Sequence, residues 1–272
     1  MIPAKKFFNA AVVGVCVLAV ISGCKKTPVN NVETVATAAQ PVAAPAPAAP
    51  AALALASMPQ LKKGIDAMPE LASATTPAAQ KINATMKSLD GTALSMLKDC
   101  KSYQRSVQPT MLGPGYFSVW VNESWDCGAY PNVSISVKVF DLNTGDAVNW
   151  TKLVSAHGVK SYSDSGADGK QGSPLALVYP ALKAMYLKDP DNAGDCQTAY
   201  DDNQSYIIWP EAKTGTLKVE AFDLPHVTQA CANDMMLTID QAQKLGFDAD
   251  FLKAVAAAHA LPGADKLAAP GS

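Results

Sequence analysis

The sequence has almost no net charge. It contains 22 lysine and arginine residues against 24 aspartate and glutamate residues, which leaves a formal charge of −2 over 272 residues. Proteins that bind nucleic acid usually carry a basic face that neutralises phosphates. This balance gives no such face, so nucleic acid is not an expected partner.

The sequence also lacks the common hydrolase motifs. Neither Gly-x-Ser-x-Gly nor His-Glu-x-x-His occurs in it. Of its three histidines, His157 precedes a glycine, His259 lies among alanines, and His226 follows Asp223 and Pro225. His226 is the best candidate for chemistry, but a packed or capping role is the simpler interpretation. We therefore predict no enzyme, no cofactor and no metal; the alternative is a peptidoglycan-acting hydrolase or modifying enzyme centred on His226.

Aromatic residues are missing from a long N-terminal stretch. None occurs between Phe8 and Tyr103, and residues 27–57 are mostly alanine, valine and proline. Frequent prolines remove hydrogen-bond donors and prevent a continuous helix. The stretch has little apolar surface to bury, so it is predicted to be a tether. A Pro-rich chain extends by about 3.1 Å per residue, which gives a reach on the order of 100 Å. A short Ala-rich helix just before Met58 is the alternative.

The apolar run near the N-terminus is too short for a comfortable membrane span. It covers Ala10–Ile21 and follows Lys5 and Lys6, which is the order of a secretory signal. It ends in Ile-Ser-Gly-Cys24, which resembles the lipobox of bacterial lipoproteins. We expect a signal peptide over residues 1–23 and lipidation of Cys24, whose acyl chains anchor the protein in the membrane. An ordinary signal peptide or an uncleaved anchor is the alternative.

The residues after Cys24 bear on the destination of the protein. They are Lys25 and Lys26, whereas retention in the inner membrane of Gram-negative bacteria is associated with aspartate at this place. The sequence therefore favours the outer membrane, with the domain in the periplasm or at the cell surface.

Four cysteines remain outside the signal peptide and the lipidation site. An even number in an exported chain predicts two disulfides, and the spacing lacks the close pairs of a zinc site. Three pairings are possible, and the favoured one is Cys100–Cys127 with Cys196–Cys231. Each of these two bridges would close a loop of about thirty residues and stabilise the fold by roughly 3–4 kcal/mol.

The hydrophobic pattern predicts an α+β domain over residues 58–263, followed by a flexible tail over 264–272. Its expected architecture is an antiparallel sheet with helices packed on one side. Expected helices cover 77–103, 175–187, 240–245 and 249–260. Expected strands cover 117–121, 133–139, 205–209 and 217–222, and a turn at 143–145 should lead to a partner strand near 148–150.

Aromatic residues offer candidate binding positions. Trp120, Trp125 and Tyr130 occur around the expected strand pair, and such residues are enriched at binding hot spots. Core packing at strand ends is the simpler interpretation. Trp120 alternates with Phe117 and Val119, so it should face the opposite side of the sheet. Together with His226, these three aromatic residues form the set of candidate binding residues.

The sequence contains an ordered series of short motifs: Met-Pro-Gln-Leu at 58–61, Ile-Asn at 82–83, Cys-Gly-Ala-Tyr-Pro-Asn at 127–132 and Phe-Asp-Leu-Asn-Thr-Gly at 140–145. This series resembles the extracellular domain of RsiV-like proteins, the lysozyme-sensing anti-sigma factors. The later stretch Asp-Leu-Pro-His-Val at 223–227, which leads to Cys231, resembles proteobacterial members of this group. The chain departs from the usual pattern in having Cys127 and Tyr130 where glycine and histidine are common.

The resemblance implies a fold and a class of partner. It covers most of residues 58–246, and a related domain accompanies some peptidoglycan deacetylases. The chain shows no transmembrane helix and no cytoplasmic anti-sigma segment, so signalling of that type is not expected. The expected function is that of an envelope-anchored lipoprotein with a non-catalytic domain that binds lysozyme or peptidoglycan fragments. A purely structural scaffold of the envelope is a further alternative.

Overall fold

A computed structural model describes residues 53–128, 130–156, 158–162, 176–189, 194–200, 204–222 and 224–267. The chain divides into two units, 1–49 and 50–272, and all described residues belong to the second. The expected signal peptide, Cys24 and most of the expected tether therefore lie outside the described residues, as does His157.

In the part of the chain that the structure describes, the strands form two five-stranded sheets. The first has the order β1-β2-β3-β4-β5, in which only β2 and β3 run parallel, and the second has the order β10-β9-β8-β7-β6 and is antiparallel throughout. The first sheet consists of β1 (Gln60–Lys62), β2 (Ile65–Asp66), β3 (Ser102–Gly113), β4 (Tyr116–Asp126) and β5 (Pro131–Asp141). The second consists of β6 (Lys160–Tyr162), β7 (Ala176–Val178), β8 (Ser205–Glu211), β9 (Thr216–Phe222) and β10 (Asp234–Leu237).

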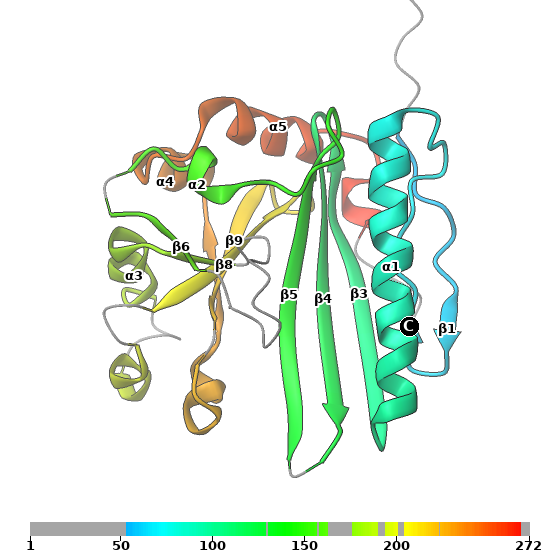
Figure 1. The fold of residues 1–272 in the computed structure, drawn as a ribbon. Coiled ribbons are helices and arrows are strands. Elements are labelled where there is room, and N and C mark those ends of the chain that lie inside the picture. Colours follow the sequence, from blue (N-terminus) through cyan, green and yellow to red (C-terminus); the bar gives the residue numbers. More distant parts are fainter. Residues whose placement is uncertain are drawn as a thin grey trace, which may run out of the picture. The chain divides into compact units, whose positions relative to one another are not determined.

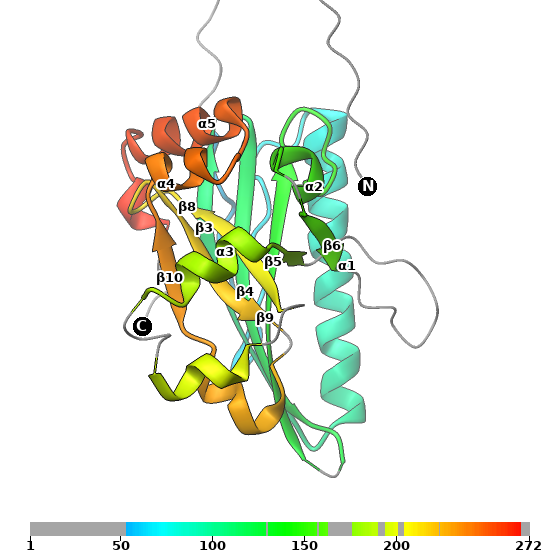
Figure 2. The same cartoon turned by 90° about the vertical axis from the view of Figure 1, so that its left-hand side faces the viewer.

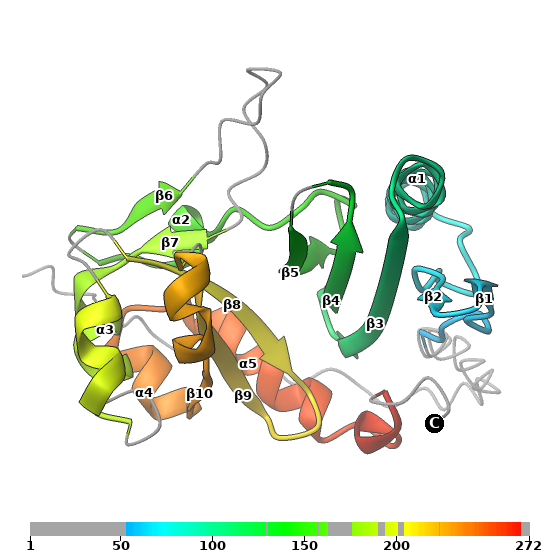
Figure 3. The ribbon, with the colours of Figure 1, turned by 90° about the horizontal axis from the view of Figure 1, so that it is seen from below.

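Each sheet carries helices on one face and turns its other face toward the other sheet. The long helix α1 lies along β3 on the far side of the first sheet, whereas α3 lies on the far side of the second (Figure 1, Figure 2). Seen from below, β8 and β9 stand opposite β3, β4 and β5 (Figure 3). The helices are α1 (Pro77–Asp99), α2 (Trp150–Leu153), α3 (Pro180–Tyr186), α4 (Ile239–Lys244) and α5 (Ala249–His259), with 3-10 turns η1 (Gly194–Ala199), η2 (His226–Cys231) and η3 (Ala264–Lys266).

The α+β class and the presence of two disulfides are confirmed. The structure adds that the expected strands are divided between two sheets. The cores follow the layers. One lies between α1 and the first sheet, and a small one lies between the two sheets. The largest lies between the second sheet and α3, α4 and α5, and it extends to Met111 and Val139 of the first sheet.

Helix α1 begins and ends where local chemistry requires. The Thr76 hydroxyl accepts a hydrogen bond from the Ala79 amide at 3.1 Å, and Pro77 occupies the first turn, where no amide donor is needed. Ile82 and Met86 are fully buried against the first sheet. The helix was expected to continue to residue 103, but it ends at Asp99 because the chain becomes extended and enters β3.

Strand β3 was not expected from the sequence. Buried and exposed side chains alternate along the first half of β3, as in a strand. One of the buried positions is Arg105, which is only 3% exposed. A charged residue at a buried position hides the apolar alternation in the sequence. Pro109 also interrupts the strand, and the register shifts between Pro109 and Met111. A buried charge and a proline thus hid the longest of the described strands.

Two other segments differ from the expectation. The helix expected over 175–187 is a short strand, β7, followed by α3, because Pro180 fits the first helical turn and not a helix interior. After the turn at 143–145, Ala147 makes an isolated bridge with Phe140, and Trp150 then begins α2 in place of a strand. The hairpin β8–β9 and helices α4 and α5 are confirmed.

The favoured disulfide pairing is confirmed. Cys100–Cys127 joins the end of α1 to the end of β4, and Cys196–Cys231 joins η1 to η2. The Cα atoms of the second pair lie 5.5 Å apart, within the usual range for a bridge.

Ordered structure extends slightly beyond the expected domain bounds. Leu55 makes an antiparallel bridge with Leu71, so the chain is extended there and not helical. At the other end, Ala264 is 8% exposed and Leu267 packs against two cores. The folded part therefore includes a few residues that were assigned to the tether and the tail.

Candidate functional site

A cleft opens between the two sheets. It encloses about 360 Å³ and is bordered by both sheets and by the segment that leads into β10. We call it the inter-sheet cleft. Its lining residues are Gln108, Thr110, Trp120, Ile135, Trp209, Glu211, Lys218, Glu220, Ala232, Asn233 and Asp234.

The first sheet contributes a neutral wall. Phe117 and Val119 point into the core beneath α1, and Trp120 points the other way and packs near Ile135 and Trp209. This confirms that Trp120 faces the opposite side of the sheet from Phe117 and Val119. Thr110 on β3 donates a hydrogen bond from its hydroxyl to that of Ser118, at 2.8 Å.

The second sheet contributes the charged wall. On β9, Leu217 and Val219 face the large core, so the intervening Lys218 and Glu220 face the cleft. Glu220 is the direct cross-strand partner of Asp234 on β10. Side chains of such partners share one face of a sheet. The register thus brings two carboxylates together that lie 14 positions apart in the sequence.

Glu220 has an unusual environment. Its side chain is only 7% exposed, and it makes no hydrogen bond with any residue that the structure describes. Burial raises the pKa of the Glu220 carboxyl to about 7; the charge of Asp234 adds to the rise, and that of Lys218 opposes it. The first-sheet lining residues carry no ionisable group. Glu220 can therefore hold a proton near neutral pH and donate a hydrogen bond into the cleft.

The other charged groups of the cleft have partners. The Lys218 ammonium forms an ion pair with the Asp234 carboxylate. The Glu211 carboxylate accepts a hydrogen bond from the Thr214 hydroxyl at 2.8 Å. Glu220 is thus the carboxylate that is left to meet a ligand.

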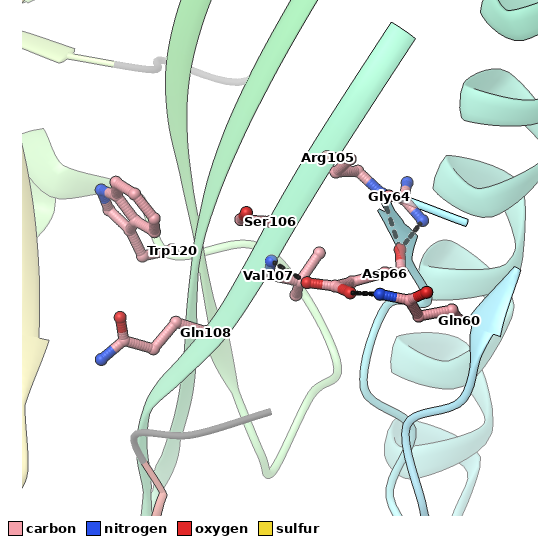
Figure 4. Close-up of a pocket in the computed structure, with 8 residues that line it drawn as sticks. All are labelled: Gln60, Gly64, Asp66, Arg105, Ser106, Val107, Gln108 and Trp120. Atoms are coloured by element: carbon pink, nitrogen blue, oxygen red, sulfur yellow. Dashed lines mark hydrogen bonds between the residues drawn. The ribbon is translucent and has the colours of Figure 1, made fainter. Parts of the chain in front are cut away.

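A second pocket, of about 300 Å³, lies at the edge of β3 and shares Gln108 and Trp120 with the cleft (Figure 4). On the side of this pocket away from Trp120, the Asp66 carboxylate accepts two hydrogen bonds. One comes from the backbone N–H of Val107 at 3.2 Å, and the other comes from the side-chain amide of Gln60 at 3.3 Å. The Arg105 guanidinium points away from Trp120, toward the Asp66 carbonyl (Figure 4). The two charged groups that line this pocket, Asp66 and Arg105, are both engaged in hydrogen bonds within the protein. The pocket therefore offers a ligand no unpaired charge comparable to Glu220 in the cleft.

The candidate binding residues are not gathered in one place. Trp120 lines the cleft, whereas Trp125 packs on the opposite face of the first sheet, near Ile65 and Tyr103. Tyr130 lies between β4 and β5 and is 71% exposed. The backbone of His226 begins η2, and its side chain lies outside the described part of the structure.

Sequence reasoning missed Glu220, Asp234 and Trp209 as cleft residues. A weak signal was available, because Lys218 and Glu220 alternate with Leu217 and Val219 in the expected strand. That pattern is also what a solvated strand face shows. Only the opposing sheet turns this face into the wall of a cleft.

The described residues contain no cluster of three or more histidine, cysteine, aspartate or glutamate side chains arranged to hold a metal ion. None of the helices in the described ranges is both long and apolar enough to cross a membrane. In comparisons with known proteins, the chain matches no family model and no curated protein significantly.

Proposed function

We propose that this protein is an envelope lipoprotein, anchored through Cys24, whose folded domain binds a saccharide-containing fragment of peptidoglycan in the inter-sheet cleft. The observation that carries the proposal is a cleft in which Trp120 and Trp209 accompany polar side chains. Indole rings supply flat apolar surface, and a few placed polar groups orient a ligand. Gln108, Thr110 and Glu220 provide such groups.

Calorimetry on the full-length mature protein in detergent micelles tests binding. Purified muropeptides and N-acetylglucosamine oligomers serve as ligands, with mass spectrometry of the ligands before and after. We expect saturable binding with unchanged ligand masses. Trp120→Ala should weaken it at least tenfold, because the ring forms part of the cleft wall.

Tyr130→Ala is the matched control for this experiment. It removes an exposed aromatic side chain outside the cleft, so the affinity should not change. If Tyr130→Ala weakens binding and Trp120→Ala does not, the ligand binds at the β4–β5 turn and the cleft proposal is wrong.

The resemblance to lysozyme sensors suggests a protein ligand as the alternative partner. Titration with a c-type lysozyme under the same conditions separates the two cases. Saturable lysozyme binding that persists in Trp120→Ala, with no response to muropeptides, would favour a lysozyme sensor or inhibitor that uses another surface.

A peptidoglycan-acting enzyme is the second candidate function, and the carboxylates of Glu220 and Asp234 on one sheet face are the observation that favours it. A protonated carboxyl beside an ionised one is the arrangement that general acid catalysis uses. Altered muropeptide masses that depend on Glu220 would replace the binding proposal with this one.

The anchor is tested separately. The wild-type protein should incorporate labelled palmitate and sediment with outer membranes, whereas Cys24→Ser should do neither. Unlabelled wild-type protein would remove the lipoprotein part of the proposal and leave the binding part untouched.

A further inference from the structure

The inter-sheet cleft has more negative than positive groups. Among the described residues, Glu211, Glu220 and Asp234 line it together with one cation, Lys218. Lys218 is already paired with Asp234, and the facing wall of the first sheet is neutral. When Glu220 is ionised, its charge therefore has no compensating cation of its own.

Glu220 itself is what points to a ligand. It is 93% buried, it lines the cleft, and no hydrogen bond from the described residues reaches its carboxylate. A buried carboxylate is stabilised by a proton, by hydrogen-bond donors or by a nearby cation. The described residues give Glu220 neither a hydrogen bond nor a cation that is not already paired. A ligand in the cleft is therefore positioned to supply both through one cationic donor.

The aromatic residues favour the same kind of ligand. Trp209 is 4% exposed and lies on the same face of the second sheet as Glu220, and Trp120 faces it from the first sheet. The face of an indole ring carries partial negative charge and attracts ammonium groups. The same face can also stack against a sugar ring.

We infer that the cleft selects saccharides that carry a free, protonated amine over their N-acetylated forms, with Glu220 as the partner of the amine. This inference rests on the proposed saccharide binding and names the chemical group that the site recognises. An N-acetyl group cannot form an ion pair with Glu220, and it leaves the carboxyl to take its proton from solvent.

The test compares glucosamine oligomers with N-acetylglucosamine oligomers of the same length, by calorimetry at pH 7 on the full-length mature protein. We expect the free amine form to bind at least tenfold more tightly. Glu220→Gln should reduce this preference to less than threefold. Asp250→Asn, which removes one exposed carboxylate of α5 outside the cleft, should leave the preference unchanged.

Each other outcome overturns the inference in a distinguishable way. Equal affinities, or tighter binding of the N-acetylated form, reject amine selection but retain saccharide binding. An equal loss of preference in both variants shows a general charge effect and not a site. Failure of both oligomers and of muropeptides to bind rejects the proposed function together with the inference. If Glu220→Gln does not fold, the comparison of the two oligomers on the wild-type protein still tests amine selection. Glu220→Asp keeps the carboxylate and should retain a preference for the free amine form.

Discussion

At the scale of single residues, Glu220 couples stability to pH. Its carboxyl has a pKa of about 7 in the folded protein, against an ordinary value of 4.5. Between these values the folded state binds a proton that the unfolded state has lost. The free energy of unfolding therefore falls as pH rises from about 4.5 to 7, by roughly 3 kcal/mol in all for this group.

Glu220→Gln removes this titration. We expect urea unfolding to show that the variant gains stability relative to wild type as pH rises from 5 to 8, because only the wild type must ionise a buried carboxyl. Parallel stability profiles over this range would show that Glu220 does not titrate there. Asp250→Asn serves as the control, and its profile should follow that of wild type.

Two glycines give opposite expectations for alanine. Gly145 has φ +71°, and a Cβ there would lie 2.5 Å from the carbonyl oxygen of Ala78 in α1. At Gly91, on the exposed face of α1, such a Cβ would meet no atom within 4 Å apart from its chain neighbours and the adjoining helix backbone. Thermal unfolding should show Gly145→Ala less stable by roughly 2–4 kcal/mol, from backbone strain and overpacking. Gly91→Ala should be more stable by up to about 1 kcal/mol. A neutral Gly145→Ala would contradict the close approach of this turn to α1.

At the scale of elements, a buried cation joins α1 to the first sheet. The Arg105 side chain on β3 is 1% exposed and pairs with Asp90 of α1. It also donates hydrogen bonds to the carbonyl of Leu89 at 3.1 Å and to that of Asp66. These contacts connect three elements of the first sheet layer: α1, β2 and β3.

Arg105→Met removes this connection. We expect a loss of roughly 3–5 kcal/mol in urea unfolding, because Asp90 is left as a poorly solvated charge without its partner. Lys253→Met, which breaks the exposed pair with Asp250, is the matched control and should cause no measurable change. A similar small effect in both variants would mean that the buried pair adds little to stability.

At the scale of the whole molecule, the two disulfides stabilise different parts. Cys100–Cys127 links the C-terminal end of α1 to the end of β4 in the first sheet. Cys196–Cys231 links η1, which precedes β8, to η2, which precedes β10. Their sequence separations are 27 and 35 residues.

Replacing either pair with serines should lower the free energy of unfolding by about 3–4 kcal/mol, because the unfolded chain regains loop freedom. Denaturant unfolding under non-reducing conditions measures this, with reduced wild type as the reference that lacks both bridges. If one double variant matches wild type, the corresponding bridge contributes nothing to stability.

Short-range patterns accounted for much of the fold. The sequence alone predicted the start of α1 from Pro77, the alternating strands β4 and β5, and the β8–β9 hairpin, because helix caps and strand alternation act over a few residues. It also predicted that Trp120 and Phe117 face opposite sides of their sheet. Cysteine number and spacing favoured the observed disulfide pairing.

Tertiary structure alone decided the rest. Which strands share a sheet depends on partners far apart in the chain, so the division into two sheets carries no local signal. Arg105 became a core residue only because Asp90 and two carbonyl groups neutralise and bind it. Glu220 also depends on distant parts of the chain. It lines a cleft because the first sheet covers its face of β9 and because the pairing of β10 with β9 places Asp234 beside it.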